Sequence, residues 1–226
     1  MTEFQNLGLS KALLKALDVH GFNTPTPIQE KAIPLLLAGK DLLGLAKTGT
    51  GKTAAFGLPL AHHLLKREGR PAPKTVSALI LAPTRELANQ ITENLRKFTQ
   101  RTPLFVGTVV GGQSIHVQRK SLARGMDILV ATPGRLLDHA KSKSVFLDKT
   151  QFLVLDEADQ MLDLGFIHEL RKIAALLGTP RQTMLFSATM PGPMEELSRA
   201  YLSEPKRVQV APPGKAADKI TQSVHF

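Results

Sequence analysis

Two short stretches of this chain carry side chains that together could bind and split a nucleoside triphosphate. The first is a loop that reads Ala46-Lys47-Thr48-Gly49-Thr50-Gly51-Lys52-Thr53. Glycines allow a loop to wrap closely around a phosphate chain, a lysine directly after the last glycine reaches the β- and γ-phosphates, and the next threonine hydroxyl can ligate Mg²⁺. The second stretch, much later in the chain, reads Asp156-Glu157-Ala158-Asp159. Together they predict a site for a triphosphate and its magnesium ion.

The acidic pair Asp156 and Glu157 directly follows a run of four apolar residues at 152–155. A carboxylate at the tip of a buried strand can bind a metal, directly or through water, and the adjacent carboxylate can polarise an attacking water. Two adjacent acids also suit the start of a helix, so the pair alone leaves both interpretations open. Its combination with the lysine loop favours Lys52, Asp156 and Glu157 as catalytic residues, with Thr53 and Asp156 as magnesium ligands, partly through water.

The glycine loop has one competing interpretation, because Gly49-x-Gly51-x-x-Ala54 also satisfies the dinucleotide-binding fingerprint. That fingerprint requires an acidic residue at the end of the next strand, where it holds a ribose. The next strand-like run instead ends in Leu81-Ala82-Pro83. The strict phosphate-loop pattern has glycine where Ala46 stands, and a plain glycine-rich turn between a strand and a helix remains the other alternative.

Strand-like and helix-like segments alternate along the chain, which is typical of a doubly wound α/β sheet. The apolar runs are mostly continuous, as expected of parallel strands buried on both faces. We expect strands near 41–46, 76–82, 104–110, 127–131, 152–156, 183–188 and 207–210, and helices near 52–66, 84–100, 114–124, 133–142, 166–178 and 192–203. Ligands of such a sheet bind at the carboxyl ends of its strands, where the chemically interesting residues fall.

Composition restricts the kind of partner and of chemistry. The chain of 226 residues has 29 lysines and arginines against 19 acids, a formal net charge of +10, and no cysteine. A basic surplus favours a polyanionic partner such as nucleic acid, although it can also serve only solubility. The absence of cysteine excludes disulfides, a thiolate zinc site and a cysteine nucleophile. No signal peptide or membrane-spanning run is recognisable, so we expect a cytoplasmic protein without a membrane partner.

A series of short motifs in a fixed order resembles the N-terminal RecA-like domain of bacterial-type DEAD-box ATP-dependent RNA helicases. Residues 21–29, with Phe22, Thr24 and Gln29, are similar to the Q motif of the family, and residues 46–53 to its motif I. Residues 83–88 resemble motif Ia, Gly111-Gly112 the glycine pair, and Thr132-Pro133-Gly134-Arg135 motif Ib. Residues 156–159 spell motif II, and Ser187-Ala188-Thr189 is motif III. The fold implied is a RecA-like P-loop NTPase with a mostly parallel sheet of about seven strands.

For the nucleotide, the resemblance implies that Phe22 stacks on adenine and that Gln29 reads the adenine edge. Thr24 and the whole loop, Ala46, Lys47, Thr48, Gly49, Thr50, Gly51, Lys52 and Thr53, would complete the ATP site, with Mg²⁺ as the cofactor. Residues 26–29 also read as a helix capping box, in which Thr26 is the N-cap and Gln29 the third helical residue, and both roles could coexist. Lys47 departs from the family, which commonly has glutamine there.

For RNA, the resemblance implies contacts from motifs Ia and Ib and from the glycine pair. The residues are Thr84, Arg85, Gly111, Gly112, Thr132, Pro133, Gly134 and Arg135. Hydroxyls, guanidinium groups and free backbone amides would hold phosphates and sugars without reading bases. Helix caps and surface arginines are the simpler alternative at each position. Asp159, Ser187 and Thr189 would couple hydrolysis to strand separation.

The resemblance also implies a division of the chain. Residues 1–40 would be a Q-motif segment packed on the core, 41–210 the first RecA-like domain, and 211–226 a linker leading into a second RecA-like domain. Because that second domain supplies arginines to the ATP site, we expect this chain alone to be a monomer that binds nucleotide weakly, hydrolyses it little and does not unwind RNA. Another P-loop enzyme, or an RNA-binding module with a vestigial nucleotide site, would be the alternatives.

Overall fold

The structure is a computed structural model that describes residues 3–210 of the chain. Its centre is one sheet of seven strands in the order β3-β4-β2-β5-β6-β1-β7, and every neighbouring pair is parallel. The strands are β1 (Leu42–Leu45), β2 (Val76–Leu81), β3 (Val106–Val109), β4 (Met126–Ala131), β5 (Phe152–Leu155), β6 (Gln182–Ser187) and β7 (Lys206–Gln209). The predicted α/β class and strand number are confirmed, and the sheet is entirely parallel.

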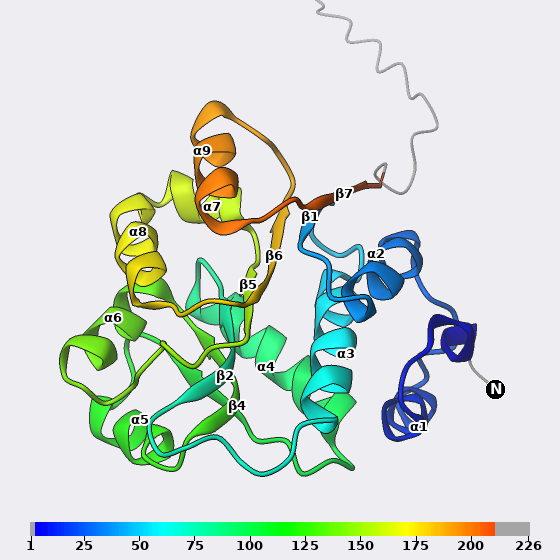
Figure 1. The fold of residues 1–226 in the computed structure, drawn as a ribbon, viewed down its shortest axis with the longest axis horizontal. Helices are drawn as coiled ribbons and strands as arrows, with labels where there is room; N and C mark the ends of the chain where they lie inside the picture. The colour runs from blue at the N-terminus through cyan, green and yellow to red at the C-terminus, as the bar shows by residue number, and fades with distance from the viewer. Residues whose placement is uncertain (1–2, 211–226) are drawn as a thin grey trace, which may run out of the picture.

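Helices cover both faces of the sheet (Figure 1). One face carries η1 (Glu3–Leu7), α1 (Lys11–Val19), α2 (Pro27–Leu37), α3 (Lys52–Leu65) and α4 (Arg85–Thr99). The other carries α5 (Ile115–Leu122), α6 (Pro133–Lys141), α7 (Ala158–Asp163), α8 (Ile167–Leu176) and α9 (Gly192–Tyr201). All six predicted helices are present with ends displaced by at most two residues. The expected linker at 211–226 lies outside the described residues.

Two hydrophobic cores result from the alternation of side chains along buried strands. In β2, Ala78 and Ile80 enter the core beneath α3 and α4, whereas Leu79 and Leu81 enter the core beneath α6 and α8. Strands buried on both faces must be apolar at every position, which is why the sequence shows continuous rather than alternating runs. Within residues 3–210, no helix combines the length and apolar character needed to cross a bilayer.

The N-terminal segment belongs to the first of these cores. Phe4 is fully buried with residues of α1, α2 and α3, and the backbone N–H of Glu3 donates to the carbonyl of Asn23. Phe4 therefore has the packing role that is usual for a buried aromatic residue. The segment packs against α2, and the N-cap and first turn of α2 contact the loop that follows β1.

The carboxyl ends of the strands lie at one edge of the sheet, as parallel pairing requires. Backbone N–H groups of Ala46, Ala82 and Asp156 donate to Ser187, Ala131 and Leu81 respectively, just beyond or at the last paired residues. Residues that are far apart in sequence are thereby brought side by side. Every predicted site residue that follows a strand is collected at this edge.

Candidate functional site

The glycine loop connects β1 to α3 at the carboxyl edge of the sheet. Gly49 and Gly51 have φ values of +81° and +89°, which glycine adopts without steric cost. Gly51 is also crowded, because a Cβ atom there would collide with Nε2 of Gln29 and lie 3.0 Å from Oγ1 of Thr26. Glycine is thus required at position 51 both by the backbone conformation and by the close approach of α2.

Side chains of the Q segment hold this loop from the α2 side. The hydroxyl of Thr26 donates to the carbonyl of Thr50 at 2.9 Å, and the amide of Gln29 donates to the carbonyl of Gly51 at 3.0 Å. The backbone N–H of Thr26 donates in turn to Oε1 of Gln29 at 2.9 Å, as in a capping box. Gln29 keeps one N–H and one oxygen lone pair for a further partner, so its capping contact does not exclude base recognition.

The central feature of the site is the ammonium group of Lys52. Its Nζ lies 3.5 Å from Oδ1 of Asp156 and 3.7 Å from Oε1 of Glu157, and the Lys52 side chain is only 5% exposed. Within residues 3–210, this buried nitrogen has no hydrogen-bond partner. An ammonium group held among carboxylates but without a hydrogen bond is available to a phosphate oxygen. The predicted meeting of Lys52, Asp156 and Glu157 is therefore present in the structure.

Asp156 has an unusual protonation equilibrium. Burial is the largest cause and raises the pKa of its carboxyl, Glu157 raises it further, and Lys52 opposes both, so that the pKa is about 6. A cation at this carboxylate would offset the cost of burying its charge. The side chain thus fits the chemistry of a magnesium ligand.

Glu157 is held in a defined position by its backbone and by the glycine loop. Its φ of +53° and ψ of +52° are left-handed, a conformation that is uncommon for residues other than glycine and is often found at functional sites. Its Oε1 accepts a hydrogen bond of 2.6 Å from the hydroxyl of Thr48. The carboxylate therefore faces the loop, beside Lys52.

A magnesium ion fits this donor set only together with other ligands. Thr53 and Asp156 both line the pocket, but the described residues contain no group of three or more His, Cys, Asp or Glu side chains able to enclose a metal. Mg²⁺ commonly uses one or two carboxylates plus waters and substrate phosphates. Thr53 and Asp156 beside the phosphate loop match that pattern.

These groups line one pocket of about 320 Å³. Its walls are Phe22, Gln29, Thr48, Gly49, Gly51, Lys52, Thr53, Ala54, Leu87, Gln90, Asn94, Phe98, Asp156 and Glu157. Four residues predicted for the nucleotide site do not line it, and one of them is Thr50, whose carbonyl accepts from the Thr26 hydroxyl. Ala46 is buried at the end of β1, and Lys47 is exposed, with its carbonyl accepting from the Thr50 hydroxyl at 2.8 Å. Thr24 is exposed outside the pocket as well.

At its far end, beside Phe22, the pocket has an aromatic wall. Phe22 meets Phe98 edge to face, with ring centroids 5.4 Å apart. Gln90 and Asn94 of α4 also line the pocket, and neither was predicted from the sequence. A signal existed, since Leu87, Gln90, Asn94 and Phe98 are spaced three or four residues apart and so share one face of the predicted helix.

The residues predicted to contact RNA surround the carboxyl ends of β2, β3 and β4, which are neighbours in the sheet. Thr84 caps α4 by accepting from the N–H of Leu87 at 3.2 Å. Arg85 is 51% exposed and reaches Gly112, where an added Cβ would lie 2.7 Å from its Nη1. Motif Ia and the glycine pair are thus in direct contact, although the sequence separates them.

The third part of this surface begins at α6. Thr132 and Pro133 start the helix, and Gly134 has open space around its Cα. Arg135 is half-buried because its Nη1 donates to the carbonyl of Gln113 at 2.9 Å and to Oε1 of Gln118 at 3.0 Å. It therefore joins the glycine-pair loop to α6, and part of its donor capacity is already used within the chain.

The residues predicted to couple hydrolysis to RNA form a compact hydrogen-bonded unit. Oδ2 of Asp159 accepts from the backbone N–H groups of Ala188 and Thr189 and from the Thr189 hydroxyl, at 3.0–3.1 Å. Burial alone would raise the pKa of Asp159, but the hydrogen bonds from Thr189 and Gln160 outweigh it and lower the pKa. The buried Ser187 donates to the Thr189 carbonyl at 2.7 Å. The strand tip of β6 is thereby tied to the start of α7.

Comparison with known proteins gives a consistent family. The family of DEAD/DEAH box helicases matches residues 26–197. The chain is 46% identical over 210 residues to the ATP-dependent RNA helicase CshA of Listeria monocytogenes, covering 93% of this chain and 39% of that protein. It is 45% identical over 222 residues to DEAD-box ATP-dependent RNA helicase 24 of Arabidopsis thaliana, covering 98% of this chain and 29% of that protein.

A solved structure shares the fold. The crystal structure of a hypothetical ATP-dependent RNA helicase from Sulfolobus tokodaii superposes with a TM-score of 0.81 at 32% identity, covering 89% of this chain and 57% of that one. The chain spans less than half the length of the two curated relatives described above.

Proposed function

This chain belongs to the DEAD/DEAH box helicase family, and from that premise we propose that it is the ATP- and RNA-binding half of an ATP-dependent RNA helicase. The observation that supports this most strongly is the buried Lys52 ammonium, which lies between Asp156 and Glu157 at the base of a nucleotide-sized pocket.

In the proposed reaction, Lys52 holds the β- and γ-phosphates of ATP while the backbone of the glycine loop wraps around them. Thr53 and Asp156 hold Mg²⁺, partly through water. The ion, when bound, neutralises charge that develops on the phosphate oxygens. Glu157 orients the attacking water and accepts its proton, and the hydrogen bond from Thr48 keeps that carboxylate aligned beside the phosphates.

We assign base selection to the far end of the pocket. Phe22 offers a ring face for stacking, and the free N–H and lone pair of Gln29 match the N7 acceptor and N6 donor of adenine. Gln90 and Asn94 also line the pocket and add amides to it. Thr24 and Lys47, both exposed, would act on the nucleotide only after a rearrangement or through the second domain.

RNA would lie across the carboxyl ends of β2, β3 and β4. Arg85 with Gly111 and Gly112, the start of α6 at Thr132, Pro133 and Gly134, and Arg135 present guanidinium and amide groups to a sugar-phosphate backbone. Such contacts bind phosphates independently of sequence and weaken with salt. Asp159, Ser187 and Thr189 connect this edge of the sheet to the catalytic acids and would transmit hydrolysis to bound RNA.

The full activity would require a second RecA-like domain that follows residues 211–226. We take 1–40 as a Q-motif segment and 41–210 as the first RecA-like domain. An arginine supplied from a second domain is worth about 10³–10⁵ in rate in related phosphoryl transfers. The chain alone, as a monomer, would therefore bind ATP weakly and turn it over slowly.

The test compares this chain with the full-length protein in titrations with ATP, GTP and single-stranded RNA. We expect ATP preferred over GTP in both proteins, and RNA-stimulated hydrolysis only in the full-length protein, abolished there by Glu157→Gln. Equal binding of GTP would favour a different P-loop enzyme. Hydrolysis that persists in Glu157→Gln would show that Glu157 does not activate the water. Full-length protein that binds RNA but hydrolyses no ATP would favour a module whose nucleotide site is vestigial.

A further inference from the structure

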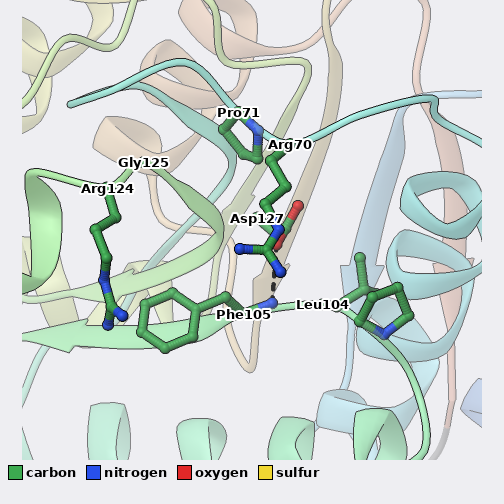
Figure 2. Close-up of a pocket in the computed structure, with 8 residues that line it drawn as sticks. Arg70, Pro71, Leu104, Phe105, Arg124, Gly125 and Asp127 are labelled. Atoms are coloured by element: carbon green, nitrogen blue, oxygen red, sulfur yellow. Dashed lines mark hydrogen bonds between the residues drawn. The ribbon is translucent and has the colours of Figure 1, made fainter.

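A second pocket lies at the opposite edge of the sheet, at the amino ends of β2, β3 and β4. It has a volume of about 270 Å³ and is lined by Arg70, Pro71, Pro103, Leu104, Phe105, Arg124, Gly125 and Asp127 (Figure 2). None of these residues belongs to the nucleotide pocket or to the surface described for RNA. The strands between the two edges are four to six residues long, so the second pocket is separate from both.

Two arginines on different loops give the pocket its charge. Arg70 precedes β2 and Arg124 precedes β4, both are exposed, and Figure 2 shows their side chains on either side of Phe105. Within residues 3–210, neither guanidinium forms an ion pair with a carboxylate, whereas Arg67 close by is paired with Asp127. Each therefore retains its hydrogen-bond donors for an anion from outside.

The one acidic residue that lines the pocket, Asp127, is paired with an arginine from outside it. Asp127 is buried, its Oδ1 accepts from Arg67, and its Oδ2 accepts from the backbone N–H of Phe105 at 2.8 Å. The carboxylate thus fixes the start of β3, and with it the position of the Phe105 ring. Its charge is balanced by Arg67, so Arg70 and Arg124 give the pocket a net positive charge.

Phe105 distinguishes this pocket from a simple anion site. The ring is 39% exposed although it is large and apolar, and the guanidinium of Arg124 lies 4.9 Å from its centroid. An exposed aromatic ring beside an arginine is a stacking platform of the kind that single-stranded nucleic acids use, with the base on the planar groups and the phosphate on the guanidinium. Inorganic phosphate has no planar group that could stack on the Phe105 ring, so the ring favours a ligand that carries a base.

We propose that this pocket binds one nucleotide of a single RNA strand, with the base stacked at Phe105 and Arg124 and the phosphate held by Arg70 and Arg124. The volume is near the lower limit of ligand pockets, so it admits a single nucleotide and no duplex. The assignment of RNA rests on the proposed function, because a free nucleotide would offer the same chemistry.

The place of β3 in the sheet supports an RNA strand as the source. β3 is an edge strand, with Gly111 and Gly112 beyond its carboxyl end and Phe105 at its amino end. The distance along this strand from Phe105 to Val110 is about 17 Å at the usual rise per residue. A strand bound at the glycine pair could therefore pass along the outer edge of β3, where Arg96 donates to the carbonyl of Val106 at 3.2 Å, and reach the second pocket without crossing the molecule.

The test measures binding of fluorescein-labelled single-stranded RNA of increasing length to the chain by anisotropy, at several salt concentrations. For long RNA we expect Arg70→Ala and Arg124→Ala each to lower affinity and to reduce the slope of affinity against salt by about one. Phe105→Ala should lower affinity about five-fold or more and leave the slope unchanged, since stacking involves no counterion. Arg124→Lys should restore the slope but not the stacking.

The matched control is Lys149→Ala, which removes one exposed positive charge just before β5, at the same end of the sheet but outside the pocket. RNA too short to reach the pocket should bind these five variants and the unchanged chain alike. Pocket variants that bind long RNA no more weakly than Lys149→Ala would overturn the inference. The inference would also be overturned if the pocket variants weakened binding of a free nucleoside monophosphate as much as they weaken binding of long RNA.

A further variant in the same experiment tests the proposed function separately from the second pocket. Arg85→Ala lies on the carboxyl-edge surface and should weaken binding of short and long RNA together. If Arg85→Ala acts and the pocket variants do not, the further inference fails and the proposed function stands. If RNA of every length fails to bind the unchanged chain, the proposed RNA-binding function fails, and the inference fails with it.

Discussion

The side-chain amide of Gln29 donates a hydrogen bond of 3.0 Å to the carbonyl of Gly51, the last glycine of the phosphate loop. The residue that we propose reads the base is therefore in contact with the loop that we propose holds the phosphates. Both residues depend on α2 lying against the loop, which explains why the Q segment is part of the site although it precedes the first strand.

Replacement of this amide should reduce discrimination between bases. In Gln29→Ala the loss of hydrogen bonds worth about 0.5–1.5 kcal/mol each should lower ATP affinity several-fold and bring it close to that for GTP. Calorimetric titration with both nucleotides measures the ratio. Gln100→Ala, on an exposed residue outside the pocket, is the control. An ATP to GTP ratio that Gln29→Ala leaves intact would show that the amide does not read the base.

A methyl group at Gly51 should abolish nucleotide binding. Gly51→Ala imposes a left-handed backbone on a residue with Cβ, a cost of about 1 kcal/mol, and drives that Cβ into Gln29. Gly69→Ala is a matched control because Gly69 also has a positive φ of +73° but has open space around it. Denaturant unfolding should show both variants destabilised, while nucleotide binding is lost only in Gly51→Ala. Normal binding by Gly51→Ala would contradict the observed contact.

Asp156 should make both stability and magnesium binding depend on pH. Its folded pKa of about 6 lies above the ordinary aspartate value of 3.8, so the folded state binds the proton more tightly. Without ligand, stability should therefore fall as pH rises from about 4 to 6, and no further cost should accrue above that range. Magnesium requires the ionised carboxylate, so Mg²⁺-nucleotide affinity should rise through the same range and level off above it.

Two variants separate Asp156 from its neighbour. Asp156→Asn should lose the pH dependence of stability in this range and should bind Mg²⁺-nucleotide weakly at every pH. Glu157→Gln keeps the Asp156 carboxyl and should keep the dependence. Denaturant unfolding and calorimetry across this pH range measure the two effects. A pH profile of the unchanged chain that is flat between about 4 and 6 would argue against the raised pKa.

The contact between Asp159 and Thr189 should affect coupling more than nucleotide binding. Asp159→Ala removes the acceptor of two backbone N–H groups and one hydroxyl, all of them exposed to water, so the loss of stability should be only about 0.5–1.5 kcal/mol. ATP affinity should change little, because neither residue lines the nucleotide pocket. In the full-length protein, RNA should no longer stimulate hydrolysis. If stimulation survives in a folded Asp159→Ala protein, this contact has no coupling role.

Much of this site could be predicted because parallel strands bring their carboxyl ends to one edge. Lys52 follows β1 and Asp156 follows β5, so a sequence that places both at strand ends also places them together. The same rule located Thr84, Gly111 and Thr132. A residue that directly follows a strand lies at the carboxyl edge of a parallel sheet, so its position can be predicted from the order of strands and helices.

The remainder depended on packing that the sequence does not specify. Gln90 and Asn94 line the pocket because α4 turns that face toward Phe22, an orientation set by the core beneath the helix. Thr24 lies two residues from Phe22 but is exposed, because the backbone turns between them. The contact of Arg85 with Gly112 and the left-handed backbone of Glu157 are likewise tertiary features.

The central claim is that the ammonium group of Lys52 binds the phosphates of a magnesium nucleotide held by Asp156. Calorimetric titration of Mg²⁺-ATP into Lys52→Met tests it most directly, with Lys149→Met as a control for the loss of one positive charge. We predict that Lys149→Met binds like the unchanged chain and that a folded Lys52→Met shows no measurable binding. Binding of Mg²⁺-ATP to Lys52→Met with the affinity of the unchanged chain would contradict the account.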